Sequence, residues 1–194
     1  MNVLIIGGGI SGISAAKVVI KEGHNAIILE STSDLGGTMA RIANCRIGFK
    51  TFYDEIRDDP KLKVVRDASI MATERSGETF SVSLSNGEVL VVDRVIVAAG
   101  LKPYEPEEHR GRRVLTSLEY DAKIDQRLGE LPEDFDKIGF FLCVGSRSKE
   151  YPLCSSVCCS YTIREVKWTL QRAKPEIAVF YNDLRLFGQE FYLE

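Results

Sequence analysis

The first third of the chain alternates between short apolar runs and one helix-like pattern. Val3–Ile6 is continuously apolar, which is typical of a strand buried on both faces of a parallel sheet. Apolar residues then recur at helical spacing, at Ile13, Ala16 and Ile20. The pattern ends at Gly23, a residue suited to a helix C-terminus, and a second apolar run follows at 26–29. This order predicts a strand–helix–strand unit.

The middle of the chain contains the short runs expected of a sheet. Strand-like runs cover residues 62–65, 69–72, 79–84, 89–92 and 95–98. Asn86-Gly87 stands between two of these runs, and this dipeptide between alternating runs is a strong hairpin signal. We therefore expect a β-meander that is followed by a buried strand at 95–98.

The last third repeats the strand–helix–strand order. A strand is predicted from Ile138 to Val144, a helix from Tyr161 to Ala173, and a returning strand at 177–180. The helix should bury one stripe, formed by Cys159, Ile163, Val166, Leu170 and Ala173. A shorter helix is predicted at 118–128, after a proline-containing stretch of mixed charge that suits a linker.

These patterns divide the chain into three expected regions. They are a first domain at 1–100, a linker with a short helix at 101–136, and a second βαβ unit at 137–194. The composition is that of an ordinary globular protein, with 194 residues, 44% hydrophobic and 27% charged. The net charge is -3, and no strongly basic face is apparent in the sequence. Both observations argue against nucleic acid as a partner.

The chain also lacks the sequence features of membrane insertion and export. No apolar run approaches the roughly 20 residues of a membrane-spanning helix. No signal peptide precedes the first strand, so we expect a cytoplasmic protein.

A glycine loop lies directly between the first strand and the first helix. Gly7, Gly9 and Gly12 form a Gly-x-Gly-x-x-Gly motif that includes Ile10 and Ser11. In this context the first glycine makes a tight turn, the second lets the backbone approach a pyrophosphate, and the third lets helix and strand pack closely. The helix N-terminus adds partial positive charge. The motif therefore predicts a dinucleotide site.

The second strand ends at Glu30, whose carboxylate we expect to bind ribose hydroxyls, with Ser31 beside it. Leu35-Gly-Gly-Thr38 resembles the Gly-Gly stretch that flavoproteins of the glutathione-reductase type place beside the diphosphate. This likeness favours FAD over NAD and assigns three residues to it: Gly36, Gly37 and Thr38. It also places three residues near the adenine and diphosphate: Ala68, Ala99 and Gly100.

Four of the five cysteines lie within residues 143–159, the cysteine segment. They are Cys143, Cys154, Cys158 and Cys159. If the next helix begins near Cys154, that residue and Cys158 share one helix face, and Cys143 reaches in from the strand end. Four thiolates suit zinc or an iron–sulfur cluster, although zinc sites usually have two short cysteine pairs. Buried free thiols and disulfides are the alternatives, and adjacent cysteines make poor disulfide partners.

The cysteine segment resembles the signature of the heterodisulfide reductase A-subunit family. The matching motifs are Cys143-Val-Gly-Ser-Arg147, Tyr151-Pro-Leu-Cys154-Ser-Ser-Val-Cys158-Cys159 and Phe180-Tyr-Asn-Asp-Leu-Arg-Leu-Phe-Gly188. The resemblance implies that the four cysteines hold a [4Fe-4S] cluster beside FAD. The region 39–50 keeps only Cys45, whereas the methanogenic enzyme has a further cysteine-rich insertion there. The chain is therefore more similar to the A-like subunit of the sulfur-oxidising heterodisulfide-reductase-like complex.

The expected fold class is α/β. It consists of a Rossmann-like FAD-binding domain of the glutathione/thioredoxin reductase type with a β-meander, followed by the βαβ unit that carries the cluster. The family continues into a second half of the flavin domain, so the resemblance implies an N-terminal fragment of an electron-transfer subunit, with B- and C-type partner subunits and a homodimeric assembly. No catalytic residue is assigned. Two other functions stay open: a dithiol/disulfide reductase that uses the cysteines directly, and a flavin-binding scaffold with structural zinc.

Overall fold

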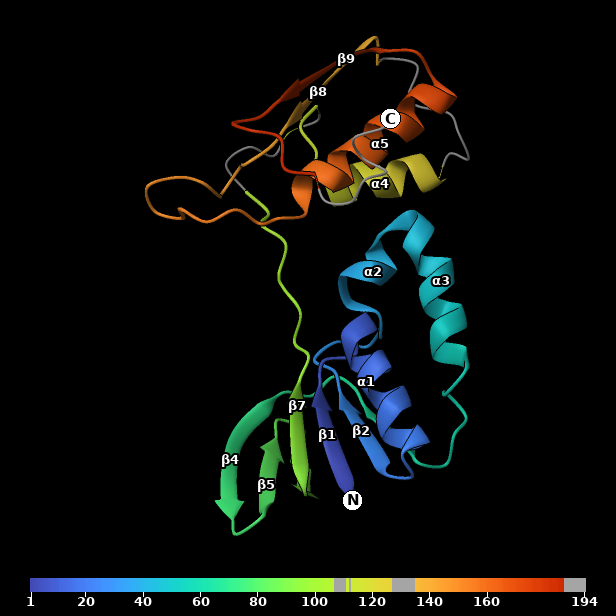
Figure 1. The fold of residues 1–194 in the computed structure, drawn as a ribbon, viewed down its shortest axis with the longest axis vertical. Helices are drawn as coiled ribbons and strands as arrows, with labels where there is room; N and C mark the ends of the chain where they lie inside the picture. Colours follow the sequence, from blue (N-terminus) through green and yellow to red (C-terminus); the bar gives the residue numbers. More distant parts are fainter. Residues whose placement is uncertain (107–110, 112, 127–134, 187–194) are drawn as a thin grey trace. The chain divides into compact units, whose positions relative to one another are not determined.

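The computed structural model describes residues 1–106, 111, 113–126 and 135–186. The chain divides into two compact units, Met1–Pro103 (unit 1) and Tyr104–Glu194 (unit 2). Figure 1 shows the elements of each unit. In the described residues, no helix has both the length and the apolar composition that crossing a bilayer requires.

Unit 1 is built on a parallel four-stranded sheet in the order β3-β2-β1-β7. Its strands are β1 Asn2–Ile6, β2 Asn25–Leu29, β3 Leu62–Val65 and β7 Arg94–Val97. Helix α1, Ile10–Lys21, connects β1 to β2 and ends before Gly23, whose φ of 84° suits glycine. The predicted strand–helix–strand unit is confirmed.

Successive residues of β1 and β2 supply a separate core on each face of this sheet. Ile5 and Ile28 belong to a cluster with residues of α1 and of the helical segment that follows β2. Leu4 and Leu29 belong to a second cluster, on the side of the β-meander. All four side chains are buried, because both faces of a parallel sheet are covered. This explains why the two strands read as continuous apolar runs.

The β-meander consists of three antiparallel strands in the order β4-β5-β6. They are β4 Ile70–Ser76, β5 Thr79–Leu84 and β6 Val89–Val92. In the turn between β5 and β6, the Gly87 amide donates to the Leu84 carbonyl at 3.0 Å, and Asn86 accepts from the Glu88 amide at 3.0 Å. The hairpin predicted at Asn86-Gly87 is confirmed.

One expectation for unit 1 is wrong. The run at 95–98 was expected to be buried, but β7 is the last strand of its sheet and Val97 is 75% exposed. Helices α2 (Gly37–Arg41) and α3 (Ala43–Asp54) occupy much of the stretch between the second glycine pair and β3. Phe49, Phe52, Tyr53 and Ile56 recur at the spacing of a helix face, which indicates a helix here. All four side chains pack in the core that contains Ile5 and Ile28.

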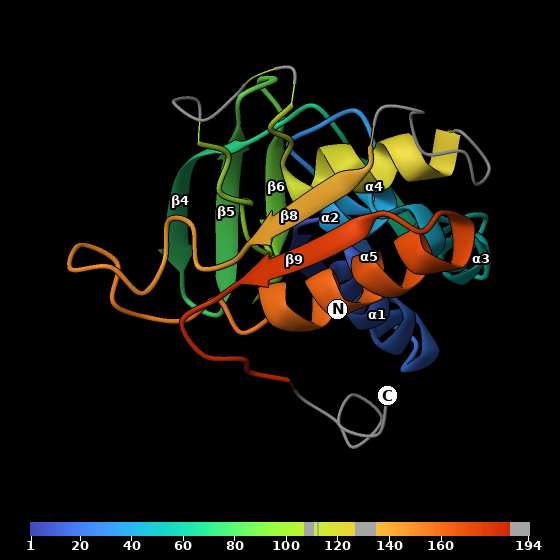
Figure 2. The same ribbon diagram turned by 90° about the horizontal axis from the view of Figure 1, so that it is seen from above.

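Unit 2 contains the second βαβ unit, as predicted. Strands β8 (Lys137–Phe141) and β9 (Glu176–Phe180) pair in parallel, and helix α5 (Cys158–Arg172) connects them. Figures 1 and 2 show α5 and α4 (Ser117–Gln126) lying along the same face of this two-stranded sheet. The short helix predicted at 118–128 is therefore present as α4, and it packs within unit 2.

The buried stripe of α5 differs from the predicted one. Besides Cys159, the buried residues of α5 are Thr162, Glu165 and Thr169. Leu170, which was expected to be buried, is 49% exposed. The cause is a polar contact with α4: the Thr169 hydroxyl donates to the Glu165 carbonyl at 2.8 Å and lies 2.6 Å from the Tyr120 hydroxyl. These hydrogen bonds allow polar groups to be buried between the two helices.

Candidate functional site

The glycine loop closes tightly between β1 and α1. Gly7 has a φ of 108°, and a Cβ at this position would lie 2.3 Å from the Ala98 carbonyl oxygen. A Cβ on Gly12 would lie 1.9 Å from the Gly7 carbonyl oxygen. Real Cβ atoms do not come this close to backbone, so both positions require glycine. The tight turn and the close helix–strand approach expected here are therefore present.

The second half of the loop has open space beside it. A Cβ on Gly9 would have no atom within 4 Å, and Gly9 is the residue directly before α1. The Gly36 amide donates to the Gly8 carbonyl at 2.8 Å, and a Cβ on Gly37 would lie 3.6 Å from the Gly9 Cα. The two glycine stretches that the sequence assigned to one diphosphate thus lie side by side. An extended phosphate group fits the open side of Gly9, close to the amides of the first turn of α1.

Glu30 is 9% exposed and joins the glycine loop to the end of β2. Its Oε2 accepts from the Gly8 amide at 2.9 Å, while its Oε1 accepts from the Thr32 amide at 3.0 Å and from the Ser31 and Thr32 hydroxyls. Burial on its own would raise the pKa of this carboxyl, but the hydrogen bonds from Gly8, Thr32 and Ser31 lower it overall. Glu30 is therefore a carboxylate whose Oε2 keeps capacity for another donor.

The other residues assigned to the cofactor lie at the same edge of the sheet. The Ala68 amide donates to the Glu30 carbonyl at 3.3 Å, and Ala68 is 2% exposed. Ala99 and Gly100 follow β7, and Gly100 has a φ of 67°. In open parallel sheets, ligands bind at the carboxyl ends of the strands, which is where these residues stand.

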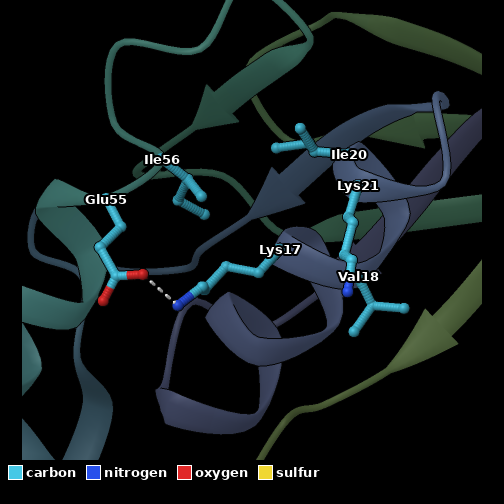
Figure 3. A pocket seen from close by; sticks show the side chains of 6 residues that line it. All are labelled: Lys17, Val18, Ile20, Lys21, Glu55 and Ile56. Carbon is cyan, nitrogen blue, oxygen red and sulfur yellow. Dashed lines mark hydrogen bonds and ion pairs between the residues drawn. The ribbon is translucent and has the colours of Figure 1, made fainter.

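A shallow surface depression on unit 1 lies away from this edge. Figure 3 shows its lining residues, which come from the C-terminal half of α1 and the end of α3: Lys17, Val18, Ile20, Lys21, Glu55 and Ile56. Lys17 pairs with Glu55 at 2.5 Å and lies over the Phe52 ring. These contacts join two helices on the outside of the unit, and the depression is not part of the glycine site.

Leu142 separates β8 from the cysteine segment, which extends into the first turn of α5. The helix predicted at 161–173 is α5 and starts at Cys158, so the condition under which Cys154 and Cys158 would share one helix face is not met. Cys154 lies in irregular backbone that precedes the helix. Among the described residues, four non-glycine residues have a positive φ, and three of them lie in this segment: Cys143 at 64°, Arg147 at 57° and Ser156 at 65°. Left-handed backbone of this kind costs free energy and is concentrated at functional sites.

Three of the four sulfur atoms accept hydrogen bonds. The Ser156 amide donates to Cys154 Sγ at 3.3 Å, the Ser155 hydroxyl to Cys158 Sγ at 3.3 Å, and the Arg185 amide to Cys159 Sγ at 3.4 Å. The left-handed conformation of Ser156 thus accompanies an amide that faces a sulfur.

Cys159 is the buried member of the four, at 4% exposed. Burial raises the pKa of its thiol, the Arg185 amide lowers it, and the nearby Cys158 and Cys143 raise it further. These influences place Cys158 and Cys143 near Cys159. In the part of the chain that the structure describes, however, no group of three or more His, Cys, Asp or Glu side chains is arranged to hold a metal ion.

Arg147 and Asp183 are further functional candidates that the fold brings into contact. Arg147 forms an ion pair with Asp183, and the Arg147 side chain is 22% exposed. Asp183 belongs to the third motif of the resemblance, residues 180–188, of which Phe187 and Gly188 lie outside the described residues. Arg147 and Asp183 are 36 positions apart, so no local sequence pattern indicates their contact.

A parallel sheet with a glycine loop before α1 and a buried acid at the end of β2 defines a dinucleotide-binding α/β domain. Residues 1–122 match the family model described as "Pyridine nucleotide-disulphide oxidoreductase". The chain belongs to this family of flavin-dependent oxidoreductases. The expected α/β fold class, with a Rossmann-like FAD-binding domain of the reductase type, is confirmed.

Curated relatives match the chain over short stretches. An L-amino acid oxidase from Cerastes cerastes is 35% identical over 66 residues, which are 34% of this chain and 13% of that protein. A flavin-containing amine oxidase from Danio rerio is 46% identical over 43 residues, which are 22% of this chain and 8% of that protein. The chain thus spans a small part of the length of these relatives.

A similarity to a solved structure covers nearly the whole chain. The L-proline dehydrogenase from P. horikoshii matches with a TM-score of 0.58 and 20% identity, over 97% of this chain and 37% of that one. At this identity the match describes the fold alone. The chain again spans well under half of its counterpart.

Proposed function

We propose that this chain is the FAD- and [4Fe-4S]-containing electron-transfer part of a heterodisulfide-reductase-like complex that acts in sulfur-compound oxidation. The observation that carries the proposal is the cysteine segment, where three sulfurs accept hydrogen bonds from Ser155, Ser156 and Arg185. Hydrogen bonds to thiolate sulfur are the contacts by which proteins tune iron–sulfur clusters. The motif resemblance supplies the cluster type and the complex.

The glycine site fits FAD. The open side of Gly9 and the amides at the start of α1 would hold the diphosphate, with Gly36, Gly37 and Thr38 alongside. Glu30 would accept hydrogen bonds from ribose hydroxyls through its Oε2.

The cysteine segment would hold the cluster through Cys143, Cys154, Cys158 and Cys159. When bound, FAD supplies a two-electron carrier and the cluster a one-electron carrier. The chain's own contribution is to keep Cys159 away from water and to place amide dipoles on the sulfurs. B- and C-type partner subunits would perform the disulfide chemistry, and the proposed assembly is homodimeric and cytoplasmic.

A dithiol/disulfide reductase is the second candidate. It is favoured by the finding that the described residues contain no group of three or more side chains arranged around a metal, while Cys158 and Cys159 stand together at the start of α5. A helix N-terminus stabilises a thiolate, the form that attacks a disulfide. A flavin-binding scaffold with structural zinc is a further alternative.

Metal and acid-labile sulfide analysis of anaerobically purified protein separates these functions. The proposed function predicts about four irons and about four sulfides per chain. The dithiol reductase predicts neither metal nor sulfide, together with rapid thiol alkylation. The zinc scaffold predicts about one zinc without sulfide.

Glu30→Ala tests the proposed FAD site. Loss of the carboxylate removes the acceptor for the ribose and frees the Gly8 and Thr32 amides, so we expect FAD to be bound at least about tenfold more weakly. Flavin released on ultrafiltration measures the change. The matched control is Glu22→Ala, which removes an exposed carboxylate after α1 and should leave flavin retention unchanged. Wild-type flavin occupancy in Glu30→Ala would contradict the ribose role.

A further inference from the structure

Asp183 joins the segment after β9 to the cysteine segment. Its carboxylate forms an ion pair with Arg147, and Oδ2 also accepts from the Arg185 Nε at 2.8 Å. Two guanidinium groups therefore share one carboxylate. Both partners belong to chain segments that contact the proposed cluster ligands.

Arg147 belongs to the loop between Cys143 and Cys154. The Ser146 amide, next to it, donates to the Cys143 carbonyl at 3.1 Å, and the Arg147 amide donates to the Leu153 carbonyl at 3.2 Å. Arg147 itself has a left-handed φ of 57° and a side chain that is 22% exposed. A residue in this conformation persists when its surroundings hold it in place. The contact with Asp183 is such a restraint on the loop.

Arg185 contacts the other end of the segment. Its backbone amide donates to Cys159 Sγ at 3.4 Å, while its side chain reaches back to Asp183. The position of this amide depends on the path of residues 181–186, which form no helix or strand. Backbone without secondary structure needs side-chain contacts to remain in one conformation.

We propose that Asp183 is a positioning residue that holds residues 181–186 against the cysteine segment, so that the Arg185 amide stays on the Cys159 sulfur and water is kept away from it. The part of this inference that concerns the cluster rests on the proposed function, in which Cys159 is a ligand. The part that concerns the metal-free protein does not. In the metal-free protein, Asp183 protects the Cys159 thiol. In the protein with its cluster, it maintains one hydrogen bond to a ligand sulfur, and such bonds favour the reduced, more negatively charged centre.

Alkylation of the reduced, metal-free full chain tests the positioning role without the cluster. Iodoacetamide modification of each cysteine is followed by peptide mass spectrometry at neutral pH. In Asp183→Asn we expect Cys159 to react about tenfold faster than in the wild type, because its side chain is 4% exposed in the folded chain and would become accessible to the reagent once residues 181–186 are released. Cys45, which lies in unit 1, should react at an unchanged rate and serves as an internal reference.

Two further variants distinguish positioning from a general effect of charge. Glu150→Gln removes a negative charge from an exposed position of the same segment and should leave the Cys159 rate at the wild-type value. Asp183→Glu keeps the carboxylate and should restore most of the protection. If Asp183→Asn does not fold, Arg147→Met breaks the same ion pair from the other side and should expose Cys159 equally. A wild-type Cys159 rate in a folded Asp183→Asn protein would overturn the proposal.

A potentiometric titration of the reconstituted protein provides a second readout. Asp183→Asn should lower the midpoint potential of the cluster, because the reduced state loses the Arg185 hydrogen bond, and Glu150→Gln should not. An unchanged potential in Asp183→Asn would overturn the tuning role. If the wild type binds no iron, the proposed function fails, and the alkylation rates still decide whether Asp183 protects Cys159.

Discussion

Glu165→Gln is expected to stabilise unit 2 on the order of 3 kcal/mol near pH 8. Glu165 is fully buried in α5, and so is Asp121 in α4. Burial raises the pKa of Glu165 to about 8, with the Asp121 charge adding to the rise and Ser117 and Arg164 opposing it. Glutamine keeps the shape of the protonated acid but has no proton to lose.

The sign of the effect follows from proton binding. Between pH 4.5 and about 8 the folded protein holds a proton on Glu165 that the unfolded chain has released. The stability contributed by this group is therefore fully present below pH 4.5 and is lost as pH rises to about 8. The difference in free energy of unfolding between Glu165→Gln and the wild type should grow across this window.

Urea unfolding at several pH values measures this difference. Trp168 is the chain's single tryptophan and lies in α5 close to Glu165, so its fluorescence reports on unit 2. Tyr120 of α4 and Tyr161 of α5 also face this carboxyl, and burial raises the pKa of each of them above its ordinary value. Glu150→Gln, at an exposed position, should follow the wild-type pH profile. Equal pH profiles for Glu165→Gln and the wild type between pH 5 and 8 would show that Glu165 is not held protonated.

Cys158→Ser is expected to remove nearly all bound iron and sulfide while leaving the flavin in place. Cys158 is the first residue of α5, and its sulfur accepts from the Ser155 hydroxyl. A serine hydroxyl is a much poorer ligand for iron than a thiolate, so an incomplete cluster should be lost during purification. Iron and sulfide quantitation, with the visible absorbance of the anaerobic protein, measures the loss.

Cys45→Ser is the matched control for this substitution. Cys45 lies in α3 of unit 1, outside the cysteine segment, and should be dispensable for iron binding. Wild-type iron and sulfide in Cys158→Ser would remove Cys158 from the proposed ligand set. Equal loss of iron in both variants would indicate a general effect of thiol removal.

The elements of unit 1 could be predicted where one side-chain periodicity dominates. β1 and β2 are covered on both faces, so their continuous apolar runs identify them, and Asn86-Gly87 marks its hairpin directly. The edge position of β7 is a property of sheet order, which a local apolar run does not contain. The apolar residues of α3 recur at helical spacing and pack against the first core, so this helix has a local signal in the sequence.

Some residues of the candidate site could likewise be predicted from the sequence, and others could not. Gly7 and Gly12 could be assigned from spacing alone, because the backbone approaches there exclude any side chain. The polar stripe of α5 could not, because burial of Glu165 depends on its contacts with α4. The ion pair of Arg147 with Asp183 joins residues that are 36 positions apart, so only the folded chain brings them together.

The central claim is that one chain binds both a flavin and a cysteine-held iron–sulfur cluster. Anaerobic reductive titration of reconstituted protein, followed by absorbance, tests this claim most directly. The account predicts uptake of about three electrons per chain, two by the flavin and one by the cluster, with bleaching of both chromophores. Uptake of about two electrons by an iron-free flavoprotein would contradict it.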